Sequence, residues 1–286
     1  MLPKLKHYYH LTKPGIVYGN ILTAVAGFLF AAKLQVDFRL LAALVTGTAL
    51  VIASGCVFNN YLDRGIDIKM KRTSKRELVV GTVPGKHALI YAGCLGLVGF
   101  VALAFTNWLV IGIGAAALVS YVAVYGYAKR HSIYGTIVGT IPGAASLVAG
   151  YVAVKNQLDL GALLLFAAMA VWQVPHFYAI AIRRLDDYAA AGLPVWPVKK
   201  GIPKTKQQIV LFILLFATAN AAMTLSGYAG YSFLVVMLAI SLYWLWHGLQ
   251  GWHHPDDKKW AGSMFGLSLV VLLVLSGSLC VGAILP

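Results

Sequence analysis

Nine long apolar runs, each of a length that can cross a lipid bilayer as a helix, follow one another along the chain. Only 11% of the residues are charged, whereas soluble domains carry about 25%. Too little polar surface is left to cover a water-soluble globule of 286 residues. We therefore predict nine transmembrane spans, at residues 15–33, 40–62, 87–106, 108–127, 134–154, 160–182, 208–227, 230–249 and 262–284.

The composition of these runs favours helices over strands. They are rich in Gly, Ala, Leu and Val, and small residues let helices pack closely in lipid. Strands of a membrane barrel are only about ten residues long and alternate apolar with polar side chains. Because lipid leaves backbone groups no other partners, helices remain as the spanning structure. We predict an all-α membrane protein in which residues 1–286 form one polytopic domain, a single bundle of nine transmembrane helices.

Lysine and arginine are concentrated on one side of the predicted bundle. When the N-terminus is placed inside, 20 of the 23 basic residues fall in inside segments, and only Lys33, Arg39 and Lys155 fall outside. Cytoplasmic loops of membrane proteins carry the excess of Lys and Arg. The pattern therefore predicts a cytoplasmic N-terminus and a periplasmic C-terminus, and it explains the net charge of +14 without a nucleic-acid partner.

An amide and two carboxylates stand four residues apart at the predicted cytoplasmic end of the second span. Asn59, Asp63 and Asp67 occupy one helix face if the helix continues to Asp67. Oxygen ligands of this kind suit Mg²⁺, which proteins commonly share with substrate phosphates. The alternative is a solvated helix end with Asp63 paired to a nearby lysine. Acids in membrane segments are costly, which favours the functional interpretation.

Basic residues surround this cluster in the two long cytoplasmic loops, 63–86 and 183–207, and at the end of the fourth span. An anionic diphosphate needs cations where charge develops on it, although the same residues serve as orientation signals and attract anionic lipid. Tyr125 lies one helical turn before Lys129, which predicts a phenol and an ammonium on one face. The candidates for diphosphate binding are Asn59, Asn60, Arg64, Lys71, Arg72, Lys129, Arg130 and Arg183.

A third constellation lies within the sixth span, where Trp172 and His176 flank Pro175. A proline inside a span frees a backbone carbonyl and marks a kink. An imidazole at this depth is unusual, and a neutral histidine is a good axial ligand for haem iron. The residue also suits proton transfer, or a plain hydrogen bond to a neighbouring helix. The sequence leaves these three roles open.

Two sets of motifs carry a resemblance to a known family. The pattern Asn59-Asn60-Tyr61-x-Asp63-x-x-x-Asp67 resembles the first motif of the UbiA-type intramembrane prenyltransferase superfamily. Segments 56–61, 172–177 and 187–198 (CVFNNY, WQVPHF and DYAAAGLPVWPV) together resemble the protohaem-farnesylating family within it, the haem O synthases. The similarity extends from about Lys13 to the ninth span, nearly the whole chain.

This resemblance implies a nine-helix bundle around a central cavity that opens to lipid, in a bacterial inner membrane, with the active site towards the cytoplasm. It implies transfer of farnesyl from farnesyl diphosphate to a vinyl group of haem b, with addition of water. The product, haem O, supplies haem-copper oxidases, whose assembly proteins are candidate partners. Haem b is then a substrate, and Mg²⁺ is the cofactor.

The implied roles fall on residues of this sequence. Asp63, Asp67, Tyr125 and Lys129 are the catalytic candidates. The metal ligands are Asn59, Asp63, Asp67 and Asp187, with Asp186 as an alternative to Asp187. His176 and Trp172 are the haem-binding candidates. Two other functions remain as alternatives: prenylation of an aromatic quinone precursor, which would not need the 172–176 segment, and ion-coupled transport, which places its binding groups nearer the bilayer midplane.

Overall fold

The computed structural model describes residues 2–33 and 35–282, and all of the regular secondary structure within them is helical. The longer helices are α2 (Pro14–Ala32), α3 (Phe38–Asp67), α4 (Gly85–Leu103), α5 (Trp108–Val119), α7 (Gly135–Lys155), α8 (Leu160–Arg183), α11 (Ile202–Leu225), α12 (Tyr231–Gln250) and α13 (Asp257–Gly282). The shorter ones are α1 (Leu2–Leu11), the π-helical turn η1 (Ser120–Tyr125), α6 (Gly126–His131), α9 (Leu185–Ala190) and α10 (Trp196–Lys200).

Within the described ranges, nine helices are long and apolar enough to span a membrane, which confirms the predicted class and number of spans. The fourth of these runs from Trp108 to His131 and combines α5, η1 and α6. Most predicted boundaries are within three residues of the observed ones. The end of the ninth predicted span, at residues 283–284, lies outside the described residues.

The larger differences all occur at one end of the bundle. α3 and α6 end four or five residues later than predicted, and α11 and α13 begin five or six residues earlier. These extensions carry charged residues such as Asp63, Lys129, Lys206 and Lys258. A helix that leaves the hydrocarbon remains a helix in the headgroup region, so an apolar run marks only its lipid-embedded part.

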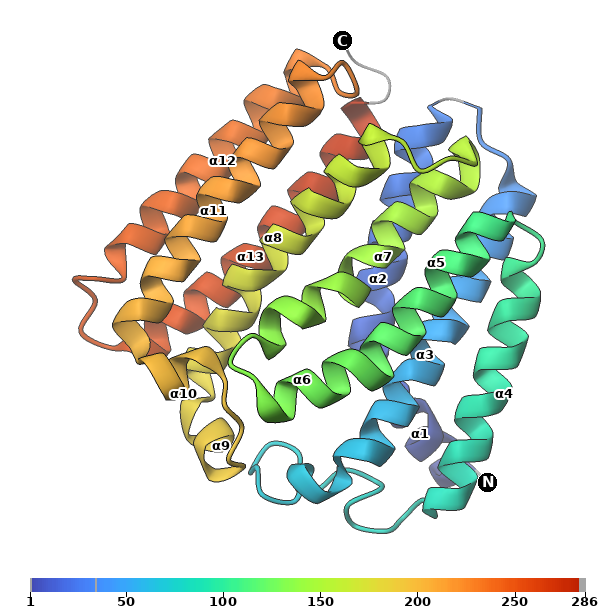
Figure 1. Cartoon of the computed structure of the whole chain (residues 1–286), viewed down its shortest axis with the longest axis vertical. Helices are drawn as coiled ribbons and strands as arrows, with labels where there is room; N and C mark the ends of the chain where they lie inside the picture. The colour runs from blue at the N-terminus through green and yellow to red at the C-terminus, as the bar shows by residue number, and fades with distance from the viewer. Residues whose placement is uncertain (1, 34, 283–286) are drawn as a thin grey trace.

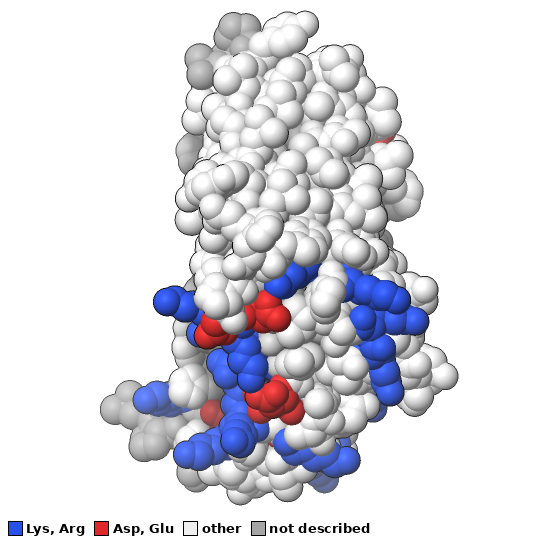
Figure 2. Space-filling view, turned by 90° about the vertical axis from the view of Figure 1, so that its left-hand side faces the viewer, with Lys and Arg blue, Asp and Glu red and all other residues white. Residues whose placement is uncertain are grey.

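The helices form one bundle in which the charged loops gather at a single end (Figure 1). α1, α9, α10 and the segment between α3 and α4 all lie at this end, whereas the last turn of α13 lies at the opposite end. In Figure 2, the Lys, Arg, Asp and Glu side chains of one face are concentrated towards the same end, and the other half of that face is almost uncharged. We call this the charged end.

Small residues allow the central helices to pack closely. A Cβ atom on Gly27 of α2 would lie 2.1 Å from the carbonyl oxygen of Leu147 in α7, and one on Gly150 would lie 2.0 Å from that of Ala24. The two backbones are therefore in direct contact, as the abundance of Gly and Ala predicted. This contact fixes α2 against α7 in the half of the bundle away from the charged end.

Candidate active site

A cavity of about 940 Å³ extends from charged side chains at the charged end to aromatic and aliphatic residues inside the bundle. Residues from α2, α3, α5, α7, α8 and α13 line it, together with the segments that follow α3 and α8. Helices from both halves of the sequence thus enclose one central space, as the resemblance implied.

The acidic cluster lies on the cavity wall because α3 continues without a break to Asp67. Asn59, Asp63 and Asp67 all line the cavity, and their exposed fractions are only 3%, 8% and 2%. The prediction that these residues share one helix face is therefore confirmed. Two carboxylates this deeply buried need partners, because an unpaired buried charge is strongly destabilising.

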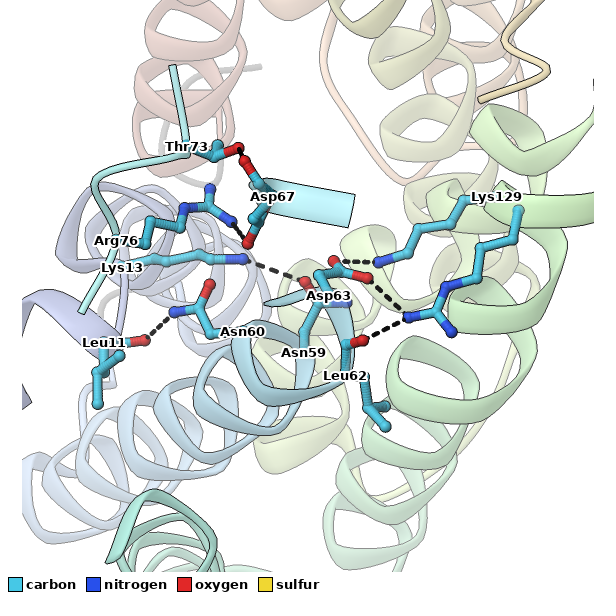
Figure 3. Close-up of polar contacts among 11 residues, drawn as sticks. Leu11, Lys13, Asn59, Asn60, Leu62, Asp63, Asp67, Thr73, Arg76 and Lys129 are labelled. Atoms are coloured by element: carbon cyan, nitrogen blue, oxygen red, sulfur yellow. Dashed lines mark hydrogen bonds and ion pairs between the residues drawn. The ribbon is translucent and has the colours of Figure 1, made fainter. Parts of the chain in front are cut away.

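Basic side chains from other segments provide those partners (Figure 3). Lys129 Nζ lies 2.5 Å from one carboxylate oxygen of Asp63, and an Arg130 nitrogen lies 3.0 Å from the other. Arg76 donates to Asp67 at 2.6 Å. The pairing of Asp63 with a lysine was one of the two interpretations of the sequence. The structure adds that this pair faces a cavity rather than open solvent.

Lys13 is a site residue that was not among the predicted candidates. Its Nζ donates to Oδ1 of Asn59 at 3.1 Å, and the residue adopts a left-handed backbone conformation (φ +52°) immediately before Pro14. Burial lowers the pKa of Lys13 to about 8, since its ammonium loses water. The one available signal was a lysine next to the proline that begins the first span.

The predicted cations divide into two groups. Arg72, Lys129 and Arg183 line the cavity, and Arg130 reaches it through Asp63. Arg64 follows Asp63 directly, so its side chain is turned by about 100° around the helix from that of Asp63. It is therefore exposed, and it donates to the carbonyl of Tyr61. For the same reason Asn60 points away from the cavity, where its amide donates to the carbonyl of Leu11.

Lys71 and the acids of the second long loop also lie outside the cavity lining. The backbone N–H of Lys71 donates to Asp187 at 3.1 Å, which connects the two charged loops. Asp186 forms an exposed ion pair with Lys258, and that hydrogen bond lowers the pKa of Asp186. α8 ends at Arg183 and a new helix starts at Leu185, so both acids turn away from the α8 face that lines the cavity. Asp187 as a metal ligand remains a prediction that this arrangement does not favour.

The oxygen atoms around Asp63 and Asp67 suit a hard cation, but they do not complete its coordination shell. Two buried carboxylates and the amide oxygen of Asn59, which accepts from Lys13, line the same wall. The buried Nδ2 atom of Asn59 has no hydrogen-bond partner, and as a donor it suits a phosphate oxygen rather than the ion. Yet no group of three or more His, Cys, Asp or Glu side chains suitable for a metal occurs in residues 2–33 and 35–282. An ion here would therefore need water or substrate oxygens to complete its shell, which is how proteins usually bind Mg²⁺.

Two tyrosines connect the charged part of the cavity to its apolar part. Lys129 Nζ lies 5.2 Å from the centre of the Tyr125 ring, which confirms the predicted pairing on one face. Tyr121 stacks on Tyr125 with a centroid distance of 5.7 Å, and both rings line the cavity. They belong to the π-helical turn η1, a feature that often occurs at functional sites. Aromatic faces in this position can stabilise a carbocation.

Trp172 and His176 form the other wall, on α8. Their rings stack at a centroid distance of 5.0 Å, and both residues line the cavity. The indole of Trp172 donates to the carbonyl of Ser268 on α13. The charged cluster and the imidazole therefore face one space, although they come from helices far apart in sequence. Such a cavity is suited to holding an anionic leaving group at one end and a large apolar acceptor at the other.

A helical membrane bundle whose cavity joins a charged cluster to an apolar pocket defines an intramembrane group-transfer enzyme. The chain belongs to the UbiA prenyltransferase family, whose sequence profile matches residues 20–272. It is 48% identical to the Protoheme IX farnesyltransferase of Enterobacter sp. (strain 638) over 283 residues, which is 98% of this chain and 96% of the relative.

Solved structures confirm the fold. A digeranylgeranylglyceryl phosphate synthase structure matches with a TM-score of 0.81 at 18% identity, over 99% of each chain. A UbiA homologue from Archaeoglobus fulgidus bound to GPP and Mg²⁺ matches with a TM-score of 0.74 at 15% identity, over 96% of this chain and 99% of that one. The chain is therefore a multi-pass membrane transferase of this family.

Proposed function

We propose that the chain transfers a farnesyl group from farnesyl diphosphate to a vinyl group of haem b, with addition of water, to give haem O. The observation that carries this proposal is its 48% identity to a Protoheme IX farnesyltransferase over nearly the whole of both chains. One cavity that contains both the Asp63 cluster and His176 supports it, because both substrates must meet there.

In this proposal the charged part of the cavity holds the diphosphate. Lys13, Arg72, Arg76, Lys129, Arg130, Arg183 and Arg184 line the cavity or pair with its two carboxylates. The cations outnumber the acids, so this region attracts a polyanion. When diphosphate enters, Lys129 and Arg130 exchange the Asp63 carboxylate for phosphate oxygens. Their charge then stabilises the leaving group as the C1–O bond of the farnesyl group breaks.

Asp63 and Asp67, with Asn59, are the residues we assign to Mg²⁺. The ion would neutralise charge on the departing diphosphate, a role that the Mg²⁺ and GPP bound to the Archaeoglobus fulgidus homologue make plausible for the fold. The protein's own task is to hold the two carboxylates on one face of α3, close to the cations that neutralise them when the ion is absent.

The apolar part of the cavity would hold haem b, with His176 at its iron and Trp172 beside the porphyrin. The terminal vinyl carbon forms a bond to C1 of the farnesyl group while diphosphate leaves with the electron pair. Water then adds to the cation next to the porphyrin and loses a proton, which gives the hydroxyl group. Tyr121 and Tyr125, between the two regions, face the path of the allylic cation.

We also propose that the charged end faces the cytoplasm of a bacterial inner membrane. This orientation rests on the distribution of basic residues, of which 20 of 23 fall on one side. It gives the diphosphate site direct access to a water-soluble polyanion, while haem b and the farnesyl chain approach from lipid.

The experiment that tests the proposal is a transfer assay with the purified protein in lipid nanodiscs. Farnesyl diphosphate, Mg²⁺ and haem b are added, and the expected product is a haem heavier by one farnesyl group and one hydroxyl group. A phenolic quinone precursor is offered in a parallel reaction. Prenylation of the phenol without prenylation of haem would overturn the proposal in favour of the quinone pathway.

A further inference from the structure

The environment of His176 determines which of its two ring nitrogens carries hydrogen. Nδ1 lies 2.7 Å from the hydroxyl oxygen of Ser268, and that same oxygen lies 2.6 Å from the backbone carbonyl of Phe265. Ser268 is fully buried, so no solvent competes for either contact. Both distances are those of hydrogen bonds and require one hydrogen each.

A serine hydroxyl has only one hydrogen to donate. The contact between Ser268 and the carbonyl of Phe265 joins two oxygens, and a carbonyl has no hydrogen, so the serine hydrogen must lie there. The contact with His176 must then use a hydrogen on Nδ1. The imidazole is neutral in this apolar span, where an unpaired charge would be costly, and a neutral ring carries only one N–H. Nε2 therefore keeps its lone pair.

The ring is also held in place by its neighbours. It stacks on Trp172, contacts Phe265 at a centroid distance of 5.0 Å, and meets the edge of Phe177 at 5.3 Å. Trp172 in turn is fixed by its hydrogen bond to the carbonyl of Ser268. Among the described residues Nε2 has no hydrogen-bond partner, and His176 lines the cavity. The lone pair is thus held in one orientation and left unused.

We propose that Ser268 is a positioning residue that holds His176 in its Nδ1–H form, so that Nε2 serves as the axial ligand of the iron of the porphyrin acceptor. This inference rests on the proposed function, because it needs haem b in the cavity. Metal-bound histidines commonly donate the N–H of their second ring nitrogen to a fixed acceptor, which orients the ring and raises its basicity. An N–H on Nε2 would instead make His176 a donor, suited to a carboxylate but unable to bind iron.

A second His–Ser pair offers a matched control, because its serine, Ser263, lies on α13 like Ser268. His247 of α12 contacts the hydroxyl of Ser263 at 2.8 Å, and that hydroxyl donates to the carbonyl of Trp260 three residues earlier. This second His–Ser pair has the same pattern as the first, but neither residue lines the cavity. Ser263→Ala therefore removes an equivalent hydroxyl from α13 without touching the proposed haem site.

The test is haem binding by the full-length protein in nanodiscs. Affinity is measured by absorbance titration, and iron ligation is measured by the iron–imidazole band in resonance Raman spectra. We expect this band in the wild type and its loss in His176→Ala. Ser268→Ala should bind haem about 10- to 100-fold more weakly, the usual cost of removing a partner behind a metal ligand, and should shift the band. Ser268→Thr, which keeps the hydroxyl, and Ser263→Ala should behave as the wild type.

Two results would overturn the inference without affecting the proposed function. One is a wild-type protein that farnesylates haem but shows no iron–imidazole band. The other is a Ser268→Ala protein with unchanged affinity and an unchanged band. By contrast, a wild-type protein that binds haem through imidazole but never farnesylates it supports the inference and refutes the proposed function.

Discussion

The two parts of the cavity solve opposite physical problems. Around Asp63, every buried charge is already paired with another side chain, so this region is stable when empty and can exchange partners when a polyanion arrives. Around His176, the neighbouring rings are aromatic, and the hydrogen-bonded imidazole leaves a lone pair for the cavity that the residue lines. The comparison indicates that the first region is built to change its contacts and the second to keep them fixed.

The largest expected effect comes from Asp63→Asn. This change removes a proposed metal ligand and the shared partner of Lys129 and Arg130, so the farnesyl transfer rate should fall roughly 100- to 1,000-fold, as when a group that stabilises developing charge is lost. Haem affinity should be unchanged. Asp186→Asn is the control, because that acid forms an exposed pair with Lys258 outside the cavity. Near-normal transfer by Asp63→Asn at saturating Mg²⁺ would contradict the assignment.

His176→Ala should produce the reverse pattern. Removing a residue that hydrogen-bonds a metal ligand costs roughly 10- to 100-fold in affinity, and losing the ligand itself should cost at least as much. Haem affinity should therefore fall by at least this factor, while farnesyl diphosphate binds as before. Isothermal titration with each substrate separates the two effects. His247→Ala, on α12 and outside the cavity, is the matched control. If His176→Ala weakens diphosphate binding equally, the two regions are not independent.

The ion pair between Arg76 and Asp67 predicts an effect on the stability of the folded protein. Arg76→Met leaves the carboxylate of Asp67, which is 2% exposed, without its partner. A buried acceptor that loses its donor costs about 1–3 kcal/mol. The thermal midpoint in detergent should therefore fall, and adding Asp67→Asn to the same protein should restore most of it. Additive losses in the double variant would show that the two residues are not coupled.

A smaller effect should appear in the pH dependence. Because the pKa of Lys13 is lowered to about 8, its ammonium is charged below this pH and becomes neutral as the pH rises through it. Affinity for farnesyl diphosphate should therefore decline above pH 8, by about tenfold per unit once Lys13 is mostly neutral. Lys13→Arg, which keeps its charge, should remove this decline. An identical pH profile in the two proteins would exclude Lys13 from diphosphate binding.

The sequence predicted those parts of the site that depend on helical periodicity. The common face of Asn59, Asp63 and Asp67 follows from residues spaced four apart, and so does the approach of Tyr125 to Lys129. The number of spans follows from hydropathy alone. These features are local, so they need no knowledge of how distant segments meet.

The rest depends on contacts between segments. Arg76 reaches Asp67 only because the chain folds back after α3, and Lys13 reaches Asn59 through a left-handed turn before α2. Ser268 lies 92 positions after His176 and resembles any other serine in an apolar span. Arg64 shows the converse case, because it follows Asp63 in sequence but is exposed and lies outside the cavity lining.

The two ligands are proposed to occupy two regions of one cavity, so they should bind to the protein at the same time. A farnesyl diphosphate analogue whose C1–O bond cannot break is bound to the protein with Mg²⁺. Haem b is then titrated by absorbance with and without this analogue. A ternary complex is expected, with haem saturating at the same stoichiometry in both titrations. Competition, in which each ligand displaces the other, would contradict it.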